Sequence, residues 1–307
     1  MADPAPPLAV VALGGNALLR RGEPASAANQ LRAARAAAQV LGPVSERTRL
    51  VVTHGNGPQV GLLALKEDAY GDGDPYPLDI LDAESGGQVG YVVELELDNA
   101  IAHQDTVTVI TRVLVDADDP AFSEPAKFIG PVYDERRAKA LAAERGWVVK
   151  PDGDKWRRVV ASPEPKKIIQ LEAIRHLVDS GFLVVCVGGG GVPVVADGVG
   201  QSGVEAVIDK DLASGLLAAG LGADILVLAT DVDAVYADWG TPRQRALAQT
   251  GPASLREHSF AAGSMRPKVE AVCRFVEATG GRAAIGRLED LPGLIDGTAG
   301  TQIQAAQ

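Results

Sequence analysis

The sequence has little of what builds cross-linked, metal-bound or membrane-embedded proteins. Of its 307 residues, 2 are cysteines and 4% are aromatic, and no apolar run approaches the roughly 20 residues that a membrane-spanning helix needs. Cys186 and Cys273 lie in apolar surroundings without a metal-binding or redox spacing, which predicts buried free thiols in a reducing compartment. The first apolar run follows Met1–Pro7 without a basic region and is too short for a signal peptide. We therefore expect a cytoplasmic protein without a membrane partner.

Positive charge is also scarce, because 29 lysines and arginines face 40 aspartates and glutamates, which gives a formal net charge of -11. A broad basic surface for nucleic acid is therefore not expected. A small group of lysines could still bind phosphate, because nearby charges dominate a local site. The length and the 46% hydrophobic content allow one large α/β domain or two lobes.

The common nucleotide-binding motifs are missing. The P-loop pattern G-x-x-x-x-G-K-[ST] does not occur, and the glycine run at 188–191 lacks the later glycine of a dinucleotide site. A phosphate site would therefore draw its cations from isolated lysines. Lys127, Lys210 and Lys268 are the candidates, since each stands close to glycine, proline or carboxylate residues.

Apolar runs alternate with helical patterns along most of the chain. Such runs are typical of strands that are buried on both faces of a parallel sheet. The patterns predict strands at 8–13, 50–53, 107–115, 182–187, 224–229 and 282–285, and helices at 26–41, 59–66, 82–103, 168–180, 203–221 and 266–279. The helix at 82–103 carries too many aliphatic residues for a single stripe, which is compatible with burial against a second subunit. The alternation predicts an α/β fold with a mainly parallel sheet between helical layers.

The pattern changes from Asp116 to about Pro165, where prolines, charges and two tryptophans replace the regular alternation. Residues 147–150 and 155–160 form a candidate hairpin that turns at Pro151–Asp154. We expect a small inserted subdomain that projects from the main sheet.

Several predicted strands end in polar or glycine-rich turns, at 14–16, 54–57, 188–191 and 230–231. Ligands of open α/β sheets bind at the carboxyl ends of the strands, and glycine lets backbone N–H groups approach an anion closely. Each turn alone could be a tight strand-to-helix connection. Together they predict a ligand site along one rim of the sheet.

The stretch 203–214 has the pattern of a buried helix that starts there, yet Asp209, Lys210 and Asp211 stand in its middle. A buried charge costs several kcal/mol unless it is paired or used. One interpretation is a solvated face with ion pairs. The neighbouring glycine turns favour a phosphate site instead, in which Lys210 stabilises a phosphoryl group and Asp211 holds the lysines by charge-assisted hydrogen bonds.

Five segments stand out as a combination: 10–18, 53–61, 157–163, 206–211, and 263–265 with 267–268. Together they resemble the carbamate kinases of the amino acid kinase superfamily, from about Ala9 to Ile303. The resemblance implies a single domain over 1–307, a three-layer α/β/α sandwich around about eight strands, and a protruding subdomain near 116–165. It also implies a homodimer that transfers a phosphoryl group reversibly between ATP and carbamate, giving ADP and carbamoyl phosphate, with Mg²⁺.

The matching positions imply roles for particular residues. The catalytic set is Lys210, Lys268 and Lys127, which neutralise the phosphoryl group, and Asp211, which organises them. The loops for carbamate and the γ-phosphoryl group contain Gly14, Gly15, Asn16, Gly55, Asn56 and Gly57. The nucleotide contacts are Lys210, Thr230, Asp231, Val232, Ala234, Tyr236, Met265 and Lys268. The amino-terminal half would carry the carbamate site and residues from about 222 to 307 the nucleotide site, without dedicated metal ligands.

Two alternatives stay open, namely another small-acid kinase of the superfamily and a non-catalytic nucleotide or metabolite sensor. The segment 157–163 and the surroundings of Lys127 argue against the first, and the intact lysine set argues against the second. Carbamate is already a charged oxygen nucleophile, so we interpret His54 as structural rather than as a general base. Arg266 stands where the family pattern suggests glycine or an apolar residue, which could adjust contacts near the nucleotide.

Overall fold

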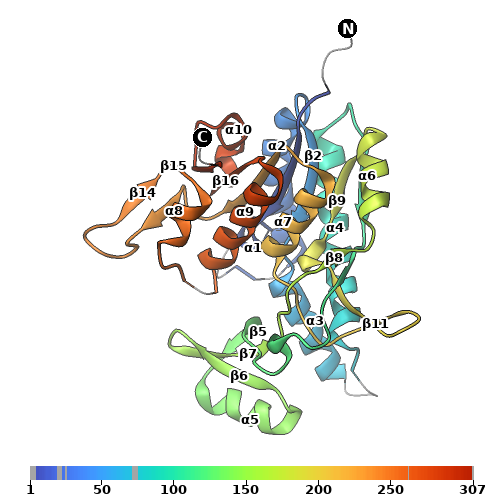
Figure 1. The fold of residues 1–307 in the computed structure, drawn as a ribbon. Helices are drawn as coiled ribbons and strands as arrows, with labels where there is room; N and C mark the ends of the chain where they lie inside the picture. Colours follow the sequence, from blue (N-terminus) through green and yellow to red (C-terminus); the bar gives the residue numbers. More distant parts are fainter. Residues whose placement is uncertain (1–4, 19–22, 25, 71–74, 262, 306–307) are drawn as a thin grey trace.

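The computed structural model describes residues 5–18, 23–24, 26–70, 75–261 and 263–305, which fold around one large sheet (Figure 1). In spatial order its strands are β15 (Gln249–Thr250), β17 (Thr301–Ile303), β16 (Arg282–Arg287), β12 (Ile225–Thr230), β1 (Leu8–Leu13), β2 (Arg49–His54), β9 (Leu183–Cys186) and β3 (Thr106–Val109). All neighbours in this order run parallel except β16 and β17, which pair antiparallel. The predicted mainly parallel sheet is therefore confirmed.

The central strand β1 shows why the sheet needs helices on both faces. All six of its residues are apolar and buried. Successive side chains of a strand point to opposite faces, so Val10 and Ala12 join one core while Val11 and Leu13 join the other. An apolar run without alternation thus places β1 in the interior of the molecule.

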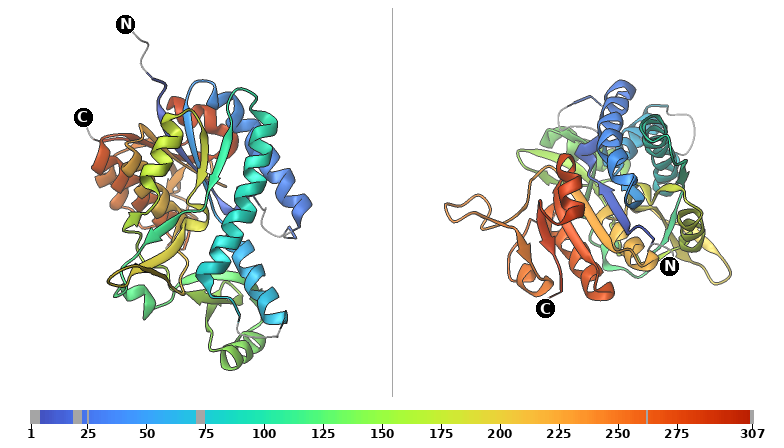
Figure 2. Two further views of the ribbon diagram at one scale, coloured as in Figure 1. Left: turned by 90° about the vertical axis from the view of Figure 1, so that its right-hand side faces the viewer. Right: turned by 90° about the horizontal axis from the view of Figure 1, so that it is seen from above.

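Helices cover both faces of the sheet and form the two outer layers (Figure 2). The helices of the whole described structure are α1 (Gly15–Leu18), α2 (Ala27–Ser45), α3 (Gly57–Tyr70), α4 (Leu78–Ala100), α5 (Glu135–Arg145), α6 (Leu171–Asp179), α7 (Lys210–Leu221), α8 (Pro252–Arg256), α9 (Met265–Thr279) and α10 (Leu291–Asp296), of which α5 lies in the lobe described below. Apolar residues of α2, α4 and α10 pack in one core. Residues of α6, α7 and α9 pack in the other. The three-layer α/β/α arrangement is confirmed.

A second sheet departs from the prediction of one strand over 107–115. The chain leaves the large sheet after β3 and enters a sheet of β11 (Gln201–Gly203), β10 (Val192–Ala196), β4 (Arg112–Leu114) and β8 (Lys167–Ile168). Thr111 Oγ1 donates to the carbonyl of Val109 and accepts from the backbone N–H of Val187, at 2.8 and 3.1 Å. The Thr111 side chain therefore fixes a bend where the alternating pattern suggested continuous strand.

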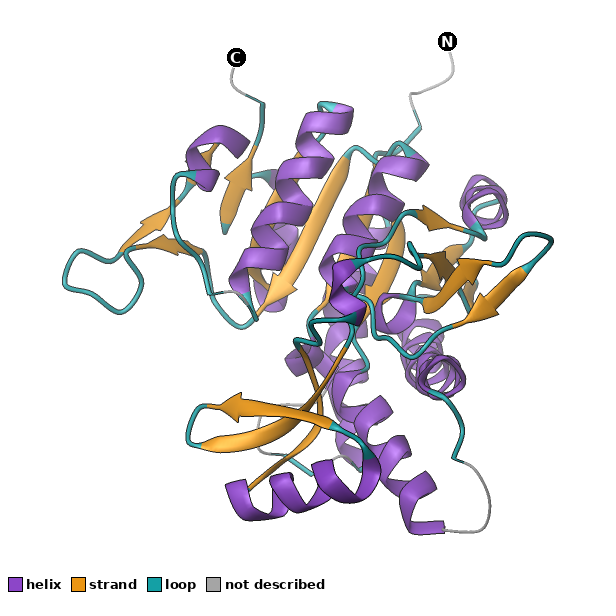
Figure 3. Cartoon of the chain, turned by 60° about the horizontal axis from the view of Figure 1, so that its bottom comes forward, coloured by secondary structure: helices purple, strands orange, loops and turns teal. Residues whose placement is uncertain are grey.

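The predicted projecting subdomain corresponds to a separate lobe below the large sheet (Figures 1 and 3). It consists of β5 (Lys127–Tyr133), α5, β6 (Val148–Asp152) and β7 (Lys155–Val160), with strand order β5-β7-β6. The β6–β7 hairpin matches the predicted one. The sequence analysis missed α5, although Asp134 caps it by accepting from the N–H of Arg137 and Gly146 ends it with φ 66°.

The lobe touches the main body at two glycines. A Cβ atom built on Gly61 of α3 would lie 2.1 Å from the Cα of Gly130 in β5. Gly130 itself has φ +68°, which side chains disfavour. Glycine at 61 lets the helix and the strand approach this closely, and glycine at 130 lets the strand adopt its positive φ. The glycine pair thus helps to fix where the lobe joins the main body.

Several predicted helices have different ends. The helix α4, predicted at 82–103, spans Leu78–Ala100. The helix α2 continues through Gly42 and Pro43 to Ser45, although Pro43 has no N–H to donate to the preceding turn. Gly42 packs near the carbonyl of Ala100. The helix α6 begins at Leu171, because the residues before it pair as β8 with β4. The helix α3 is longer than predicted at both ends.

Additional strands that the sequence analysis did not predict complete the fold. They include β10, β11, β15, β17 and an antiparallel pair of β13 (Val235–Ala237) and β14 (Arg245–Leu247). Within the described ranges, no helix is both long and apolar enough to cross a membrane. Cys186 and Cys273 are free and buried, as predicted.

Candidate active site

A cavity of about 520 Å³ opens where the central strands end. Gly14 and Gly15 follow β1, Gly55 to Gly57 follow β2, and Thr230 and Asp231 end and follow β12. The amino terminus of α7 and the start of β5 close the cavity from other sides. The predicted convergence at the carboxyl edge of the sheet is therefore present, because parallel strands end along the same rim.

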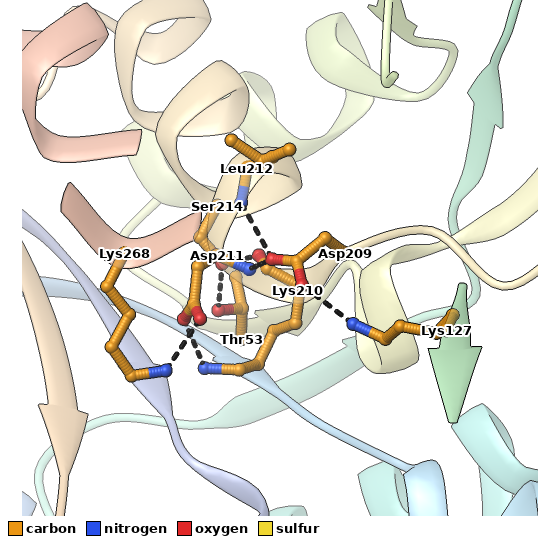
Figure 4. A network of polar contacts seen from close by, with 8 residues as sticks. All are labelled: Thr53, Lys127, Asp209, Lys210, Asp211, Leu212, Ser214 and Lys268. Atoms are coloured by element: carbon orange, nitrogen blue, oxygen red, sulfur yellow. Dashed lines mark hydrogen bonds and ion pairs between the residues drawn. The ribbon is translucent and has the colours of Figure 1, made fainter. Parts of the chain in front are cut away.

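Asp211 joins two lysines at the wall of this cavity (Figure 4). Its Oδ1 atom lies 2.7 Å from the Nζ atom of Lys210, and its Oδ2 atom lies 2.7 Å from the Nζ atom of Lys268. The side chains of Asp211, Lys210 and Lys268 are 6%, 11% and 13% exposed. One carboxylate thus holds two buried ammonium groups, which leaves the trio one positive charge in excess.

The environment keeps the Asp211 carboxylate ionised. Burial by itself would raise the pKa of Asp211, but Lys210 and Lys268 outweigh burial and hold that pKa well below its usual range. Burial lowers the pKa of Lys210, opposed by Asp211. Burial is outweighed at Lys268, whose pKa is raised by Asp211. An incoming phosphoryl group would add the negative charge that this cluster lacks.

Asp209 has a role that corrects the predicted start of the helix. The helix α7 begins at Lys210 rather than near Gly203, and Asp209 caps it by accepting from the N–H groups of Asp211 and Leu212, at 2.9 and 3.4 Å. The apolar residues before it lie in a non-helical segment and not on a helical face. The cap directs the first turn of α7 at the cavity, where a helix amino terminus favours anions.

The same Asp209 also connects the main body to the lobe. Its Oδ2 atom accepts from the Nζ atom of Lys127 at 2.7 Å (Figure 4). Lys127 is the first residue of β5, and its side chain is 31% exposed. Asp209 therefore determines both the direction of α7 and the position of the lysine that the lobe contributes.

His54 lies behind the cavity wall. Burial lowers the pKa of His54 to about 4, against the opposing effect of the Gly55 carbonyl, which lies 3.3 Å from its Nδ1 atom. A Cβ atom on Gly188 would lie 2.6 Å from the ring. These contacts favour a neutral imidazole that packs against the glycine turn, in agreement with the structural interpretation.

Aromatic side chains gather at the other end of the cavity, beyond β12. Tyr236, Trp239 and Phe260 all line it, and the rings of Tyr236 and Trp239 meet edge to face with centroids 5.3 Å apart. Trp239 is 64% exposed. Three aromatic residues at one place are notable in a chain with only 4% of them, and such rings suit a planar ligand group.

The structure brings the predicted site residues together in this one cavity. Those that line it are Gly14, Gly15, Gly55, Asn56, Gly57, Lys127, Lys210, Asp211, Thr230, Asp231, Val232, Ala234, Tyr236, Met265 and Lys268. Asn16 lies in α1, but its side chain is outside the described part. Arg266 is exposed and does not line the cavity. The chemical roles of these residues remain predictions.

Sequence reasoning missed several cavity residues. Asp209 was left without a role, although aspartate before a helix is a frequent cap. Trp239 and Phe260 lie in a region without a recognisable pattern, so no local signal identified them. Gly189, from the glycine run, also lines the cavity. In the described ranges, no group of three or more His, Cys, Asp or Glu side chains lies close enough together to hold a metal ion.

The fold and this lysine-lined cavity define a class of protein. The sequence model of the "Amino acid kinase family" matches residues 7–286. That match includes the lobe and every described residue that lines the cavity.

Comparison with individual proteins narrows the class. The carbamate kinase of Rhizobium meliloti (strain 1021) is 52% identical over 301 residues, which cover 97% of this chain and 93% of that protein. The carbamate kinase of Escherichia coli (strain K12) is 51% identical over 294 residues, or 96% and 98% of the two chains. A solved structure of the carbamate kinase from Giardia lamblia bound to AMP-PNP has a TM-score of 0.90 and 37% identity, covering 98% and 99%. The chain therefore belongs to the carbamate kinases of the amino acid kinase family, and it is a phosphotransferase.

Proposed function

We propose that the protein transfers a phosphoryl group reversibly between ATP and carbamate, giving ADP and carbamoyl phosphate. The observation that carries this proposal is the buried Lys210–Asp211–Lys268 cluster in the wall of the cavity. Phosphoryl transfer depends mainly on positioning and on neutralising charge around an in-line transition state. Two ammonium groups fixed by one carboxylate are suited to that task.

Each part of the cavity then takes a role. Lys210 and Lys268 neutralise the transferring group, and Asp211 keeps them in place. Carbamate attacks through an oxygen that is already charged, so no general base is needed, and His54 is buried behind the wall. Lys127 approaches from the lobe and completes the positive surroundings.

We further propose that the two substrates occupy opposite ends of the cavity. Carbamate and the γ-phosphoryl group bind at the glycine turns Gly14–Gly15 and Gly55–Gly57, in the amino-terminal half. The nucleotide binds in the part from about 222 to 307, along Thr230–Val232, Ala234, Tyr236 and Met265. The aromatic end beyond β12 supports this assignment, because it suits a base better than it suits carbamate.

Mg²⁺ enters with the nucleotide in this proposal. It would neutralise phosphate charge when bound. The described residues offer it no cluster of ligands, which fits an ion held largely by phosphate oxygens and water. Asp231, which lines the cavity next to the nucleotide segment, is the carboxylate best placed to contribute.

We also propose a homodimer and a cytoplasmic location. Three apolar residues of α4 are exposed on one face, namely Ile80, Tyr91 and Leu95, at 41%, 64% and 37%. Their spacings of eleven and four residues place them in one stripe. Ile110 is 54% exposed and extends the stripe, because a Cβ atom on Gly87 would lie 3.7 Å from its Cδ1 atom. A second copy that packs on this stripe would cover it.

The decisive test of the activity runs the reaction toward ATP. Purified protein is mixed with carbamoyl phosphate and MgADP, and ATP is measured by luciferase. We expect ATP well above the level of a Lys210→Ala control. If the two proteins give the same signal, the proposal is wrong. A panel of other acyl phosphates in the same assay then shows which acceptor acid the site favours.

A further inference from the structure

Asn56 is a glycine-turn residue with a described side chain that can recognise the part of the substrate that does not react. It follows Gly55 at the end of β2 and lines the cavity. Its Nδ2 atom lies 2.7 Å from Oδ1 of Asp82 and 2.8 Å from Oγ of Ser85. All three residues are buried. The two amide hydrogens of Asn56 therefore both point toward α4, away from a ligand.

The hydrogen-bond partners of Asn56 distinguish the NH₂ group of its side chain from the carbonyl oxygen. Ser85 Oγ lies 2.8 Å from the carbonyl oxygen of Leu81, one helical turn earlier. A hydroxyl has a single hydrogen, so the Ser85 hydroxyl donates to that carbonyl and must accept from its other neighbour. That neighbour is then the NH₂ end of Asn56. Ser85 thus settles the orientation of the amide without reference to any ligand.

The wall opposite α4 packs against the Asn56 amide and keeps the side chain in place. A Cβ atom on Gly189 would lie 2.3 Å from Nδ2 of Asn56 and 2.6 Å from its Oδ1, and Gly189 has φ +72°. The glycine backbone therefore packs directly on the amide. No described residue donates a hydrogen bond to Oδ1, so this oxygen is what Asn56 offers to the cavity.

Asp82 has no other evident task. Its Oδ2 atom is buried without a hydrogen-bond partner among the described residues. Burial raises the pKa of Asp82 to about 8, although Asn56 and Lys127 oppose the rise. A buried carboxyl that forms no ion pair with any side chain in the described ranges is costly and therefore unexpected in a core. Among the described residues, the Asp82 carboxyl forms its one hydrogen bond with Asn56.

We propose that Asp82 and Ser85 are positioning residues that hold Asn56 with only its carbonyl oxygen toward the substrate, and that this oxygen selects an acyl group bearing N–H over one bearing C–H. The inference rests on the proposed function and adds how the site recognises the amino group. Carbamate donates an N–H to Oδ1. Acetate, which has a methyl group in the same place, leaves Oδ1 desolvated and unpaired.

Carbamoyl phosphate and acetyl phosphate test the proposal, because the first carries NH₂ on its acyl carbon where the second carries CH₃. Each donates its phosphoryl group to ADP and releases the carboxylate-type anion, so ATP formation measures both. The quantity of interest is the ratio of kcat/KM for carbamoyl phosphate to that for acetyl phosphate. We expect Ser85→Ala and Asp82→Ala to lower this ratio by about tenfold or more, because the amide can then turn its NH₂ toward the substrate.

Matched variants separate positioning from general damage. Asp82→Asn keeps an oxygen that can accept from Asn56, so it should stay within about threefold of the wild-type ratio. Ser45→Ala also removes a hydroxyl that donates to a helix carbonyl, that of Gly42, and should leave the ratio unchanged. If Ser85→Ala and Asp82→Ala slow both phosphates equally, the proposal is overturned. If the wild type makes no ATP from carbamoyl phosphate, the proposed function itself fails.

Solvent exchange of the Asn56 side-chain amide protons, measured by NMR, tests the proposal without an activity assay. It therefore stays informative if a variant folds poorly and loses activity for that reason. In ¹⁵N-labelled protein, the side-chain amide signals of Asn56 are identified by their loss in Asn56→Asp. We expect both protons to exchange slowly with solvent in the wild type and faster in Ser85→Ala. Rapid exchange in the wild type would show that the amide is not held, and would overturn the proposal.

Discussion

At the scale of single residues, the most informative arrangement is the carboxylate that two lysines share. Asp211 fixes Lys210 and Lys268 at equal distances of 2.7 Å, so neither lysine needs to be ordered by the substrate. Pre-organised charge of this kind stabilises a transition state without a reorganisation cost. Loss of one lysine should therefore affect turnover more than binding.

We expect Lys268→Ala to lower kcat by about 10² or more, as for other contacts made to transition-state charge. Steady-state ATP formation from carbamoyl phosphate and MgADP measures the effect. Arg266→Ala is the matched control, because Arg266 also carries a positive charge in α9 but is exposed and outside the cavity. Equal rates for Lys268→Ala and the wild type would mean that the Lys268 ammonium does not contact the reacting group.

The buried Asp82 gives a prediction about pH. Its pKa is raised to about 8 by burial, while the unfolded chain has an ordinary carboxyl. The folded state therefore holds a proton that the unfolded state releases. The stability that this group contributes is complete below about pH 4 and is lost as pH rises toward 8, by up to about 1.4 kcal/mol per pH unit.

Urea unfolding of the wild type and of Asp82→Asn between pH 5 and 8 tests this. The wild type should lose stability relative to the variant as pH rises. The buried His54, whose pKa is lowered to about 4 by burial, acts in the opposite sense, losing stability as pH falls from its ordinary pKa. That contribution is common to both proteins and cancels in the difference. A difference that is independent of pH would contradict the raised pKa of Asp82.

At the scale of secondary-structure elements, the lobe and α7 meet at one ion pair. Lys127 at the start of β5 binds the aspartate that caps α7. Lys127 is more exposed than Lys210 or Lys268 and does not contact Asp211. Its place depends on a lobe that joins the body near the Gly61–Gly130 contact. The contribution of Lys127 to turnover should therefore be smaller than that of Lys210 or Lys268, and it should depend on the position of the lobe.

We expect Lys127→Ala to lower kcat less than Lys268→Ala does in the same assay. The reason is that a lobe brings its side chains into contact with the substrate only when it closes over the site. Lys139→Ala is the control, since Lys139 is on α5 of the same lobe and pairs with the exposed Glu135. That variant should behave as the wild type. A larger loss at Lys127 than at Lys268 would reverse the ranking of the two lysines.

The elements also show how far the sequence could be interpreted. Strands such as β1 were predictable because burial on both faces leaves an unbroken apolar run. The start of α7 was not, since Val204 to Ile208 have helical spacing but pack in a non-helical segment before the Asp209 cap. The glycine turns and lysines of the site were predictable from residue type and resemblance. The Asp82–Asn56 contact was not, because its partners lie 26 residues apart on different elements.

At the scale of the whole molecule, the exposed face of α4 is the feature that the monomer does not explain. The stripe of Ile80, Tyr91, Leu95 and Ile110 lies on the face of α4 opposite to the residues in the core, such as Val89 and Val93. The helix is thus apolar on two sides, as the sequence indicated. Contiguous exposed apolar surface on a folded chain usually marks an interface. A two-fold axis would pair the same stripe from two copies.

We expect Tyr91→Glu to convert the protein from dimer to monomer at micromolar concentration, as measured by light scattering after gel filtration. The reason is that a carboxylate placed in an apolar interface loses its hydration without gaining a partner. Val132→Glu is the control, because Val132 is 52% exposed on β5 of the lobe, away from the stripe. It should leave the mass unchanged. A monomeric wild type, or a Tyr91→Glu variant that stays dimeric, would show that α4 does not form the interface. The cavity is built within one chain, so the monomeric variant should still form ATP.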